Sequence, residues 1–216
     1  MSAVEIAKGI AAIIVAYTLG SIPSAYLITP LLAGVNIRQK NGAVGGLNAY
    51  RELGTASGVA VVAADMAKGV AAVGIAYWLL GLPQLFVLMV GVAAVVGHLW
   101  MIFLKFHGGG GIATSIGKLS TILPIYGYWQ GILIFIGIMV LVIIIARNVA
   151  GAAVTAQLFL PLVVWLGTHS LPIIIFSIVL GGVMGLKRLP TLKQDWTNSG
   201  SLKKFVFHNS FRRNKT

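Results

Sequence analysis

No charged residue occurs in the segment Trp129-Gln-Gly-Ile-Leu-Ile-Phe-Ile-Gly-Ile-Met-Val-Leu-Val-Ile-Ile-Ile-Ala146. A helix that crosses a bilayer needs about 20 mostly apolar residues, and several other stretches of the chain also meet this requirement. Hydrophobic residues make up 58% of the sequence and charged residues only 9%, whereas ordinary soluble domains carry about 25% charged residues. So few charges could not cover a soluble surface. We therefore expect an all-α integral membrane protein.

Hydropathy predicts clear membrane-spanning helices near residues 10–32, 57–80, 85–104, 129–146, 150–167 and 171–186. With six spans, the basic loop around Arg38 and Arg51 would lie on the opposite side from the basic tail after Leu189, which contradicts the positive-inside rule. A further helix over 112–125 removes the conflict, but it reaches only about 20 Å, less than the hydrocarbon core. We predict about seven transmembrane helices, the fourth short or re-entrant, with the N-terminus outside and the C-terminus cytoplasmic.

This topology divides the chain into a transmembrane domain over residues 1–189 and a basic cytoplasmic tail over residues 190–216. The first span lacks the cleavage spacing of a signal peptide, so we expect it to be retained. The tail is either an anchor on anionic lipid headgroups or a solvated segment that fixes topology. The formal net charge of +12 favours anionic lipids and an anionic substrate over nucleic acid. Because the chain has no cysteine, disulfides and thiolate metal sites are excluded.

Two glycine-rich segments lie on the predicted cytoplasmic face. The first runs Arg38-Gln-Lys-Asn-Gly-Ala-Val-Gly-Gly-Leu-Asn-Ala-Tyr-Arg51, and the second runs Phe106-His-Gly-Gly-Gly-Gly-Ile-Ala-Thr114. Glycines let backbone amides approach a phosphate, the start of the next helix adds its positive dipole end, and nearby Arg or Lys adds charge. Either segment alone fits a flexible link between helices equally well. Two such segments on one face, each flanked by cations, favour a shared anion pocket.

Three of the ionisable residues inside the predicted spans are candidates for function. Asp65 and Lys68 are three residues apart and therefore share one helical face. Charges inside a membrane are costly and indicate either function or mutual pairing, so a purely structural ion pair is the alternative. His98 is either a proton-transfer group or a packing histidine bonded to a backbone carbonyl. Ser21 and Pro23 break the first span, and the carbonyls freed there need partners from neighbouring helices or from water.

Several short motifs follow one another along nearly the whole chain. They are Gly20-Ser-Ile-Pro-Ser-Ala-Tyr-Leu-Ile28, Ile37-Arg38, Asn48-Ala-Tyr-Arg51, Asp65-Met-Ala-Lys-Gly69, Gly97-His98 and Gly108-Gly-Gly-Gly-Ile-Ala-Thr114. In this order and spacing the sequence resembles the acyl-phosphate:glycerol-3-phosphate acyltransferases of bacterial membranes, the PlsY type. The resemblance implies a seven-helix protein of the bacterial plasma membrane that moves an acyl chain from acyl phosphate to the 1-hydroxyl of glycerol 3-phosphate. The products would be lysophosphatidate and inorganic phosphate, and neither a metal nor another cofactor is implied.

The candidate site residues come from both glycine segments and from the intramembrane group. We predict catalytic roles for His98, Lys68 and Asp65. The predicted ligands of substrate phosphate are Arg51, Asn48, Gly45, Gly46, Gly108, Gly109, Gly111, Thr114 and Ser21. The expected partners are acyl phosphate, glycerol 3-phosphate and membrane lipids, and the oligomeric state is left open.

The chain departs from the family pattern in three places. The family's first loop reads Gly-Ser-Gly-Asn-x-Gly-Ala-Thr-Asn-x-x-Arg, and its serine, asparagine and threonine are replaced by Asn41, Ala43 and Leu47. Gly110 replaces the lysine of the family's Gly-Gly-Lys-Gly, which removes one positive charge. Gly182 stands at the histidine of the family's Arg-His-x-x-Asn-Ile-x-Arg-Leu run, of which only Arg188-Leu189 clearly survives. The nearby cations that could replace a lost charge are Lys40, Lys105 and His107.

The sequence leaves three functions open. The first is an acyltransferase with the family's substrates, whose site includes Arg51, Asn48, the glycine segments and Lys68 or His98. The second is a catalytically silent paralogue that binds acyl or phosphorylated lipid or modulates an active relative, because loss of a transition-state donor can cost about 100-fold in rate. The third is a small-solute transporter or channel, in which the broken first helix would line a pathway. The lack of a convincing internal repeat counts against the third.

Overall fold

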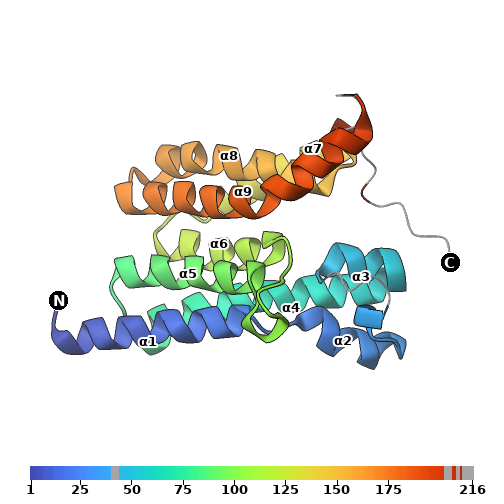
Figure 1. Ribbon diagram of the computed structural model, residues 1–216. Coiled ribbons are helices and arrows are strands. Elements are labelled where there is room, and N and C mark those ends of the chain that lie inside the picture. Colours follow the sequence, from blue (N-terminus) through green and yellow to red (C-terminus); the bar gives the residue numbers. More distant parts are fainter. Residues whose placement is uncertain (40–43, 202–205, 208–209, 211–216) are drawn as a thin grey trace. The chain divides into compact units, whose positions relative to one another are not determined.

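The computed structural model describes residues 1–39, 44–201, 206–207 and 210 (Figure 1). All regular structure within these residues is helical, as predicted. The described residues form two compact units, the first within Met1–Pro124 and the second within Ile125–Arg212. Among them, five helical stretches are long and apolar enough to cross a bilayer: Ala3–Ala33, Thr55–Leu79, Gln84–Leu104, Val149–Thr168 and Leu171–Lys193. Two shorter apolar helices are Ile112–Ile125 and Gln130–Ala146.

The first helical stretch is broken near its middle. Helix α1 (Ala3–Gly20) ends at Ser21, and α2 (Ser24–Ala33) begins directly after Pro23. Proline has no amide hydrogen and its ring collides with the preceding turn, so a regular helix does not run through this point. The Ser21 hydroxyl lies within hydrogen-bond distance of two backbone carbonyls, 2.9 Å from that of Tyr17 and 3.2 Å from that of Gly97. The predicted break is therefore confirmed.

Glycines bring α1 into close contact with α5 (Gln84–Leu99). A Cβ atom on Gly9 would lie 2.3 Å from the Phe86 ring, and one on Gly97 would lie 2.1 Å from the Tyr17 carbonyl oxygen. Small residues allow membrane helices to approach this closely. Because early residues of α1 contact early residues of α5, and late residues contact late ones, the two helices run parallel and their carboxyl ends meet (Figure 1).

Helix α4 (Thr55–Gly74) continues as the π-helical turn Ile75–Leu79. The short helix α3 (Gly46–Leu53) packs on the first half of α4. A Cβ atom on Gly46 would lie 2.2 Å from Val62 Cγ2, and one on Gly58 would lie 2.6 Å from Tyr50 Cβ. This contact fixes the first glycine segment at the amino-terminal end of α4.

Helix α6 has the bounds predicted for the short fourth helix, Ile112–Ile125. It packs on α4 through two further glycines. A Cβ atom on Gly69 would lie 2.3 Å from the Thr114 carbonyl oxygen, and one on Gly117 would lie 2.0 Å from the Met66 carbonyl oxygen. The start of α6, and with it the second glycine segment, is thereby held beside the middle of α4.

The second unit contains α7 (Gln130–Ala146), α8 (Val149–Thr168) and α9 (Leu171–Ser199). Gln157 of α8 donates through Nε2 to the Ser177 carbonyl of α9, over 3.1 Å. Helix α9 passes through the boundary predicted after Leu189, so residues 190–199 of the predicted tail continue the last helix. Residues 202–205, 208–209 and 211–216 of that tail lie outside the described residues.

Candidate functional site

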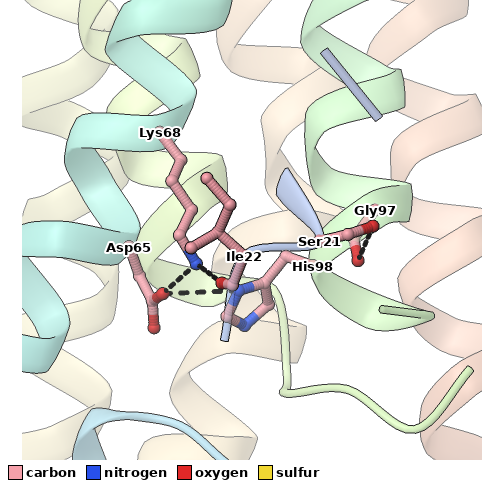
Figure 2. Close-up of polar contacts among 6 residues, drawn as sticks. All are labelled: Ser21, Ile22, Asp65, Lys68, Gly97 and His98. Carbon is pink, nitrogen blue, oxygen red and sulfur yellow. Dashed lines mark hydrogen bonds and ion pairs between the residues drawn. The ribbon is translucent and has the colours of Figure 1, made fainter. Parts of the chain in front are cut away.

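Three buried ionisable side chains meet in the first unit, where α4 faces the carboxyl end of α5 (Figure 2). The Lys68 ammonium donates to the Asp65 carboxylate, with Nζ 2.8 Å from Oδ1. The same carboxylate oxygen lies 3.6 Å from His98 Nδ1. All three side chains are at most 7% exposed. The prediction that Asp65 and Lys68 share one helical face is confirmed, and His98 joins them from another helix.

The break in the first span supplies a further partner to this group. Lys68 also donates to the Ile22 carbonyl, which lies between Ser21 and Pro23 (Figure 2). The expectation that carbonyls at the break find partners on a neighbouring helix is therefore confirmed at Ile22. A lysine ammonium has three N–H donors. Within the described residues, two of these donors are used, one toward Asp65 and one toward the Ile22 carbonyl.

The second glycine segment packs directly on His98. The Gly109 amide donates to the His98 carbonyl over 3.0 Å. A Cβ atom on Gly109 would lie 2.4 Å from His98 Nε2, and one on Gly108 would lie 2.2 Å from the His98 carbonyl oxygen. Gly111 has a φ of 76°, in the left-handed region that favours glycine. These three positions therefore need glycine for packing and backbone geometry, whereas their predicted contact with phosphate stays a prediction.

Thr114 lies in the first turn of α6 and is fully buried. Its hydroxyl makes no hydrogen bond within the described part of the chain. Its carbonyl packs on Gly69, the residue next to Lys68. Buried polar groups nearly always have a partner, and the first amides of a helix attract anions. The position of Thr114 therefore suits the predicted role of binding an anion near Lys68.

Lys118 is a buried cation that the sequence analysis missed. It lies one turn after Thr114 in α6 and is only 3% exposed. Its stem packs on α5, where a Cβ atom on Gly91 would lie 3.1 Å from Lys118 Cδ. Gly91 precedes His98 by about two helical turns, so Lys118 contacts α5 at a point well before His98. A charged residue inside an apolar helix is the sequence signal that could have found it.

The first glycine segment leads into α3. Gly45 has a φ of 120° and is followed by Gly46, the first residue of the helix. Asn48 and Arg51 lie on α3 with half-buried side chains. Because α3 packs on α4 within one turn of Asp65, both glycine segments lie toward the same end of the helices in this unit. That these α3 residues share one anion pocket with the second glycine segment stays a prediction.

The remaining candidates have simpler surroundings. Ser21 is fully buried, and its hydroxyl faces two backbone carbonyls, so its observed contacts close the break in the first span. His107 is exposed, and its Nδ1 lies 2.9 Å from the Lys105 carbonyl oxygen. Lys40, Asn41 and Ala43 lie outside the described residues. Among the side chains that the structure describes, no three His, Cys, Asp or Glu form a cluster that could hold a metal ion.

Similar sequences match most of the chain. A family model described as glycerol-3-phosphate acyltransferase matches residues 10–194. Glycerol-3-phosphate acyltransferase 1 of Dehalococcoides mccartyi is 44% identical over 176 residues, which cover 81% of this chain and 85% of the relative. Glycerol-3-phosphate acyltransferase 2 of Moorella thermoacetica is 35% identical over 184 residues, which cover 85% of this chain and 91% of the relative.

Two crystal structures of PlsY (YgiH), an integral membrane glycerol 3-phosphate acyltransferase, have a similar fold. The glycerol 3-phosphate form has a TM-score of 0.77 at 26% identity and covers 97% of this chain and 96% of that chain. The lysophosphatidic acid form has the same TM-score and identity and covers 88% of this chain and 93% of that chain. The likeness extends over both compact units.

Proposed function

Because the chain belongs to the glycerol-3-phosphate acyltransferase family, we propose that it transfers an acyl group from acyl phosphate to the 1-hydroxyl of glycerol 3-phosphate. The acceptor oxygen forms the new ester bond to the acyl carbonyl, and the bond from that carbonyl to the phosphate oxygen breaks. The hydroxyl proton leaves with a base, and the products are lysophosphatidate and inorganic phosphate. This is a step of phospholipid biosynthesis. The reaction needs no metal or other cofactor in this scheme.

The observation that carries the proposal is the buried group of Asp65, Lys68 and His98 beside the second glycine segment. Acyl transfer between two phosphate-bearing substrates needs positive groups and amide donors that act outside bulk water, where their electrostatic effect is largest. Lys68 supplies the charge, and Asp65 and the Ile22 carbonyl hold its ammonium in one place. Donors that are fixed before the reaction stabilise developing charge without reorganisation.

His98 is the proposed proton acceptor for the glycerol hydroxyl. Its Nδ1 faces the Asp65 carboxylate, which would stabilise the imidazolium formed when the ring accepts a proton. A catalytic base within hydrogen-bond reach of its proton contributes about 100- to 10,000-fold to a rate. The proposed catalytic residues are thus His98, Lys68 and Asp65.

The two glycine segments are the proposed phosphate anchors. The second segment and the Thr114 hydroxyl would bind one phosphate, because this hydroxyl is buried in the first turn of α6 and has no hydrogen-bond partner among the described residues. The first segment and α3 would bind the other phosphate, with Arg51 as the charged ligand. The complete set of proposed phosphate ligands is Arg51, Asn48, Gly45, Gly46, Gly108, Gly109, Gly111, Thr114 and Ser21.

The proposed setting is a bacterial plasma membrane crossed about seven times. The two shorter apolar helices, Ile112–Ile125 and Gln130–Ala146, would complete the seven spans together with the five longer ones. The first would be the short or re-entrant fourth span. This count keeps the N-terminus outside and brings the basic loops to the cytoplasmic side. Residues 190–216 would then form a basic cytoplasmic region that contacts anionic lipids.

The test is a turnover assay on the purified protein in lipid membranes, supplied with acyl phosphate and glycerol 3-phosphate. We expect lysophosphatidate to form, and we expect Arg51→Ala to reduce its formation by about 100-fold. Wild-type formation no higher than that of Arg51→Ala would reject the proposal. Lipid binding without turnover would indicate a silent paralogue. Solute flux that collapses in Asp65→Asn would indicate a transporter.

A further inference from the structure

An apolar groove runs along the first unit between α1 and α4. Its volume is about 190 Å³, and it is open on one side. Its α1 wall is made of Ala11, Ala12, Val15, Ala16 and Leu19, and Ala72 forms part of its α4 wall. Among the described residues that line it, Lys8 is the only charged one. A groove of this kind suits an unbranched hydrocarbon chain, because its walls offer contact area but almost no hydrogen-bonding groups.

One end of the groove lies beside the proposed catalytic group. Ala72 follows Lys68 by four residues on α4, so the two lie on the same helical face. Leu19 precedes Ile22 by three residues, and the Ile22 carbonyl accepts a hydrogen bond from Lys68. A molecule held by its phosphate at the Lys68 ammonium could therefore continue directly into the groove.

The length of the groove matches one lipid tail. Leu19 and Lys8 lie eleven residues apart on α1, which corresponds to about 16 Å at 1.5 Å per residue. The hydrocarbon core of a bilayer is about 30 Å thick, so one layer of lipid tails is about 15 Å thick. The groove thus has room for a chain that extends from the ammonium to the level of Lys8.

We infer that this groove binds the acyl chain of the acyl phosphate donor and that Lys8 at its far end sets the longest chain accepted. This inference rests on the proposed function. A chain that passed Lys8 would press methylene groups against a charged ammonium and strip it of water, which is unfavourable. A chain that ends short of Lys8 leaves part of the apolar wall uncovered. Lys8 is therefore a specificity-determining residue rather than a catalytic one.

Substitutions along the exposed side of α1 test this placement, with turnover measured over a series of saturated acyl phosphates of increasing length. Lys8→Leu should raise kcat/KM for donors longer than the wild-type optimum. Val15→Phe fills the groove about 6 Å from Leu19 and should move the optimum to shorter donors, with a loss of about fourfold per excluded methylene. Ile14→Phe is the matched control, because Ile14 is 61% exposed on the same helix and does not line the groove. Its chain-length profile should equal that of the wild type.

A second measurement does not depend on turnover. A non-hydrolysable acyl phosphonate with a photoreactive group at its methyl end should crosslink to residues close to Lys8 in the wild type, and this crosslink should be lost in Val15→Phe. If the wild type turns over normally and both Lys8→Leu and Val15→Phe keep its chain-length profile, the acyl chain does not bind in this groove. The proposed function would not be contradicted by that result. If Val15→Phe instead reduces only co-purified phospholipid, the groove is a membrane-lipid site and the inference is wrong. Absence of turnover in the wild type would reject the proposed function. The crosslink alone would then show whether an acyl chain binds in the groove.

Discussion

The two compact units differ in what they bury. The first unit encloses Asp65, Lys68, His98 and Lys118 among its helices, together with the Thr114 hydroxyl. In the described part of the second unit, the buried polar side chains are Gln157, Ser177 and Ser210. None of these three carries a charge, although the Nε atom of Arg188, a residue of intermediate exposure, is also buried.

The last of the three departures from the family pattern lies in the second unit, whereas the other two lie in the first. The histidine and asparagine of the family's last motif correspond to Gly182 and Gly185 on α9. A Cβ atom added to either glycine would meet nothing within 4 Å. Charged groups inside a membrane are costly and are retained mostly where they function. We therefore expect the charged side chains of the first unit to carry most of the electrostatic part of the reaction, and the variants below test this expectation.

The largest effect is expected for Lys68→Met. This change removes the ammonium that holds Asp65 and the Ile22 carbonyl, and it leaves a buried carboxylate without its cation. Turnover should fall about 100- to 1000-fold. The free energy of unfolding should fall by about 3–5 kcal/mol, because one partner of a buried ion pair is lost. The measurements are lysophosphatidate formation and thermal unfolding of the detergent-solubilised protein.

The double variant Asp65→Asn/Lys68→Met separates folding from chemistry. It removes both charges of the pair, so most of the lost stability should return. Turnover should stay low, because no ammonium is left to bind phosphate. A double variant with near wild-type turnover would show that the pair is structural, which was the alternative that the sequence left open.

Gly109→Ala is expected to have the next largest effect. The added Cβ would lie 2.4 Å from His98 Nε2, so the imidazole ring must move. A displacement of about 1 Å at a reacting group can cost about 100-fold, and we expect a loss of about 10- to 100-fold in kcat. Gly137→Ala in α7 is the matched control, because a Cβ there meets nothing within 4 Å. Equal losses in both variants would indicate a general effect of alanine rather than contact with His98.

The helices of this protein were largely predictable because their causes are local. Hydropathy and the break at Ser21 and Pro23 depend only on neighbouring residues, and both agree with the helix bounds in the structure. The short helix Ile112–Ile125 was predicted from charge balance. The end of α9 was not predicted, because a helix that leaves an apolar segment loses its hydropathy signal while its backbone hydrogen bonds continue.

The site was predictable only in part. The three-residue spacing of Asp65 and Lys68 predicted their contact, since helical periodicity alone brings them together. The approach of His98 to Asp65 and the contact of Gly109 with His98 depend on how separate helices pack, which the spacing along the chain does not encode. The Ile22 carbonyl was expected to find a partner, but the sequence did not indicate that Lys68 would be this partner.

Gly110→Lys returns a positive charge to the first unit. Gly110 is exposed, and it stands at the position of the lysine in the family's Gly-Gly-Lys-Gly. A hydrogen bond to a charged group contributes about 1.5–3 kcal/mol, and partial exposure reduces this contribution. We expect KM for a phosphate-bearing substrate to fall about threefold to tenfold. An unchanged KM for both substrates would show that the second glycine segment does not contact phosphate.

The smallest effect is expected for Gln157→Leu in the second unit. Gln157 donates to the Ser177 carbonyl over 3.1 Å, whereas its Oε1 has no hydrogen-bond partner among the described residues. Leucine removes one interhelical hydrogen bond, worth about 0.6 kcal/mol in a membrane protein, and it also removes an unpaired buried acceptor. Loss of the hydrogen bond lowers the stability, and removal of the unpaired acceptor raises it. Thermal unfolding should therefore shift little, and turnover should stay within about twofold of the wild type. A tenfold loss of turnover at unchanged stability would mean that the second unit supplies a polar group to the reaction, and the division between the units would then be wrong.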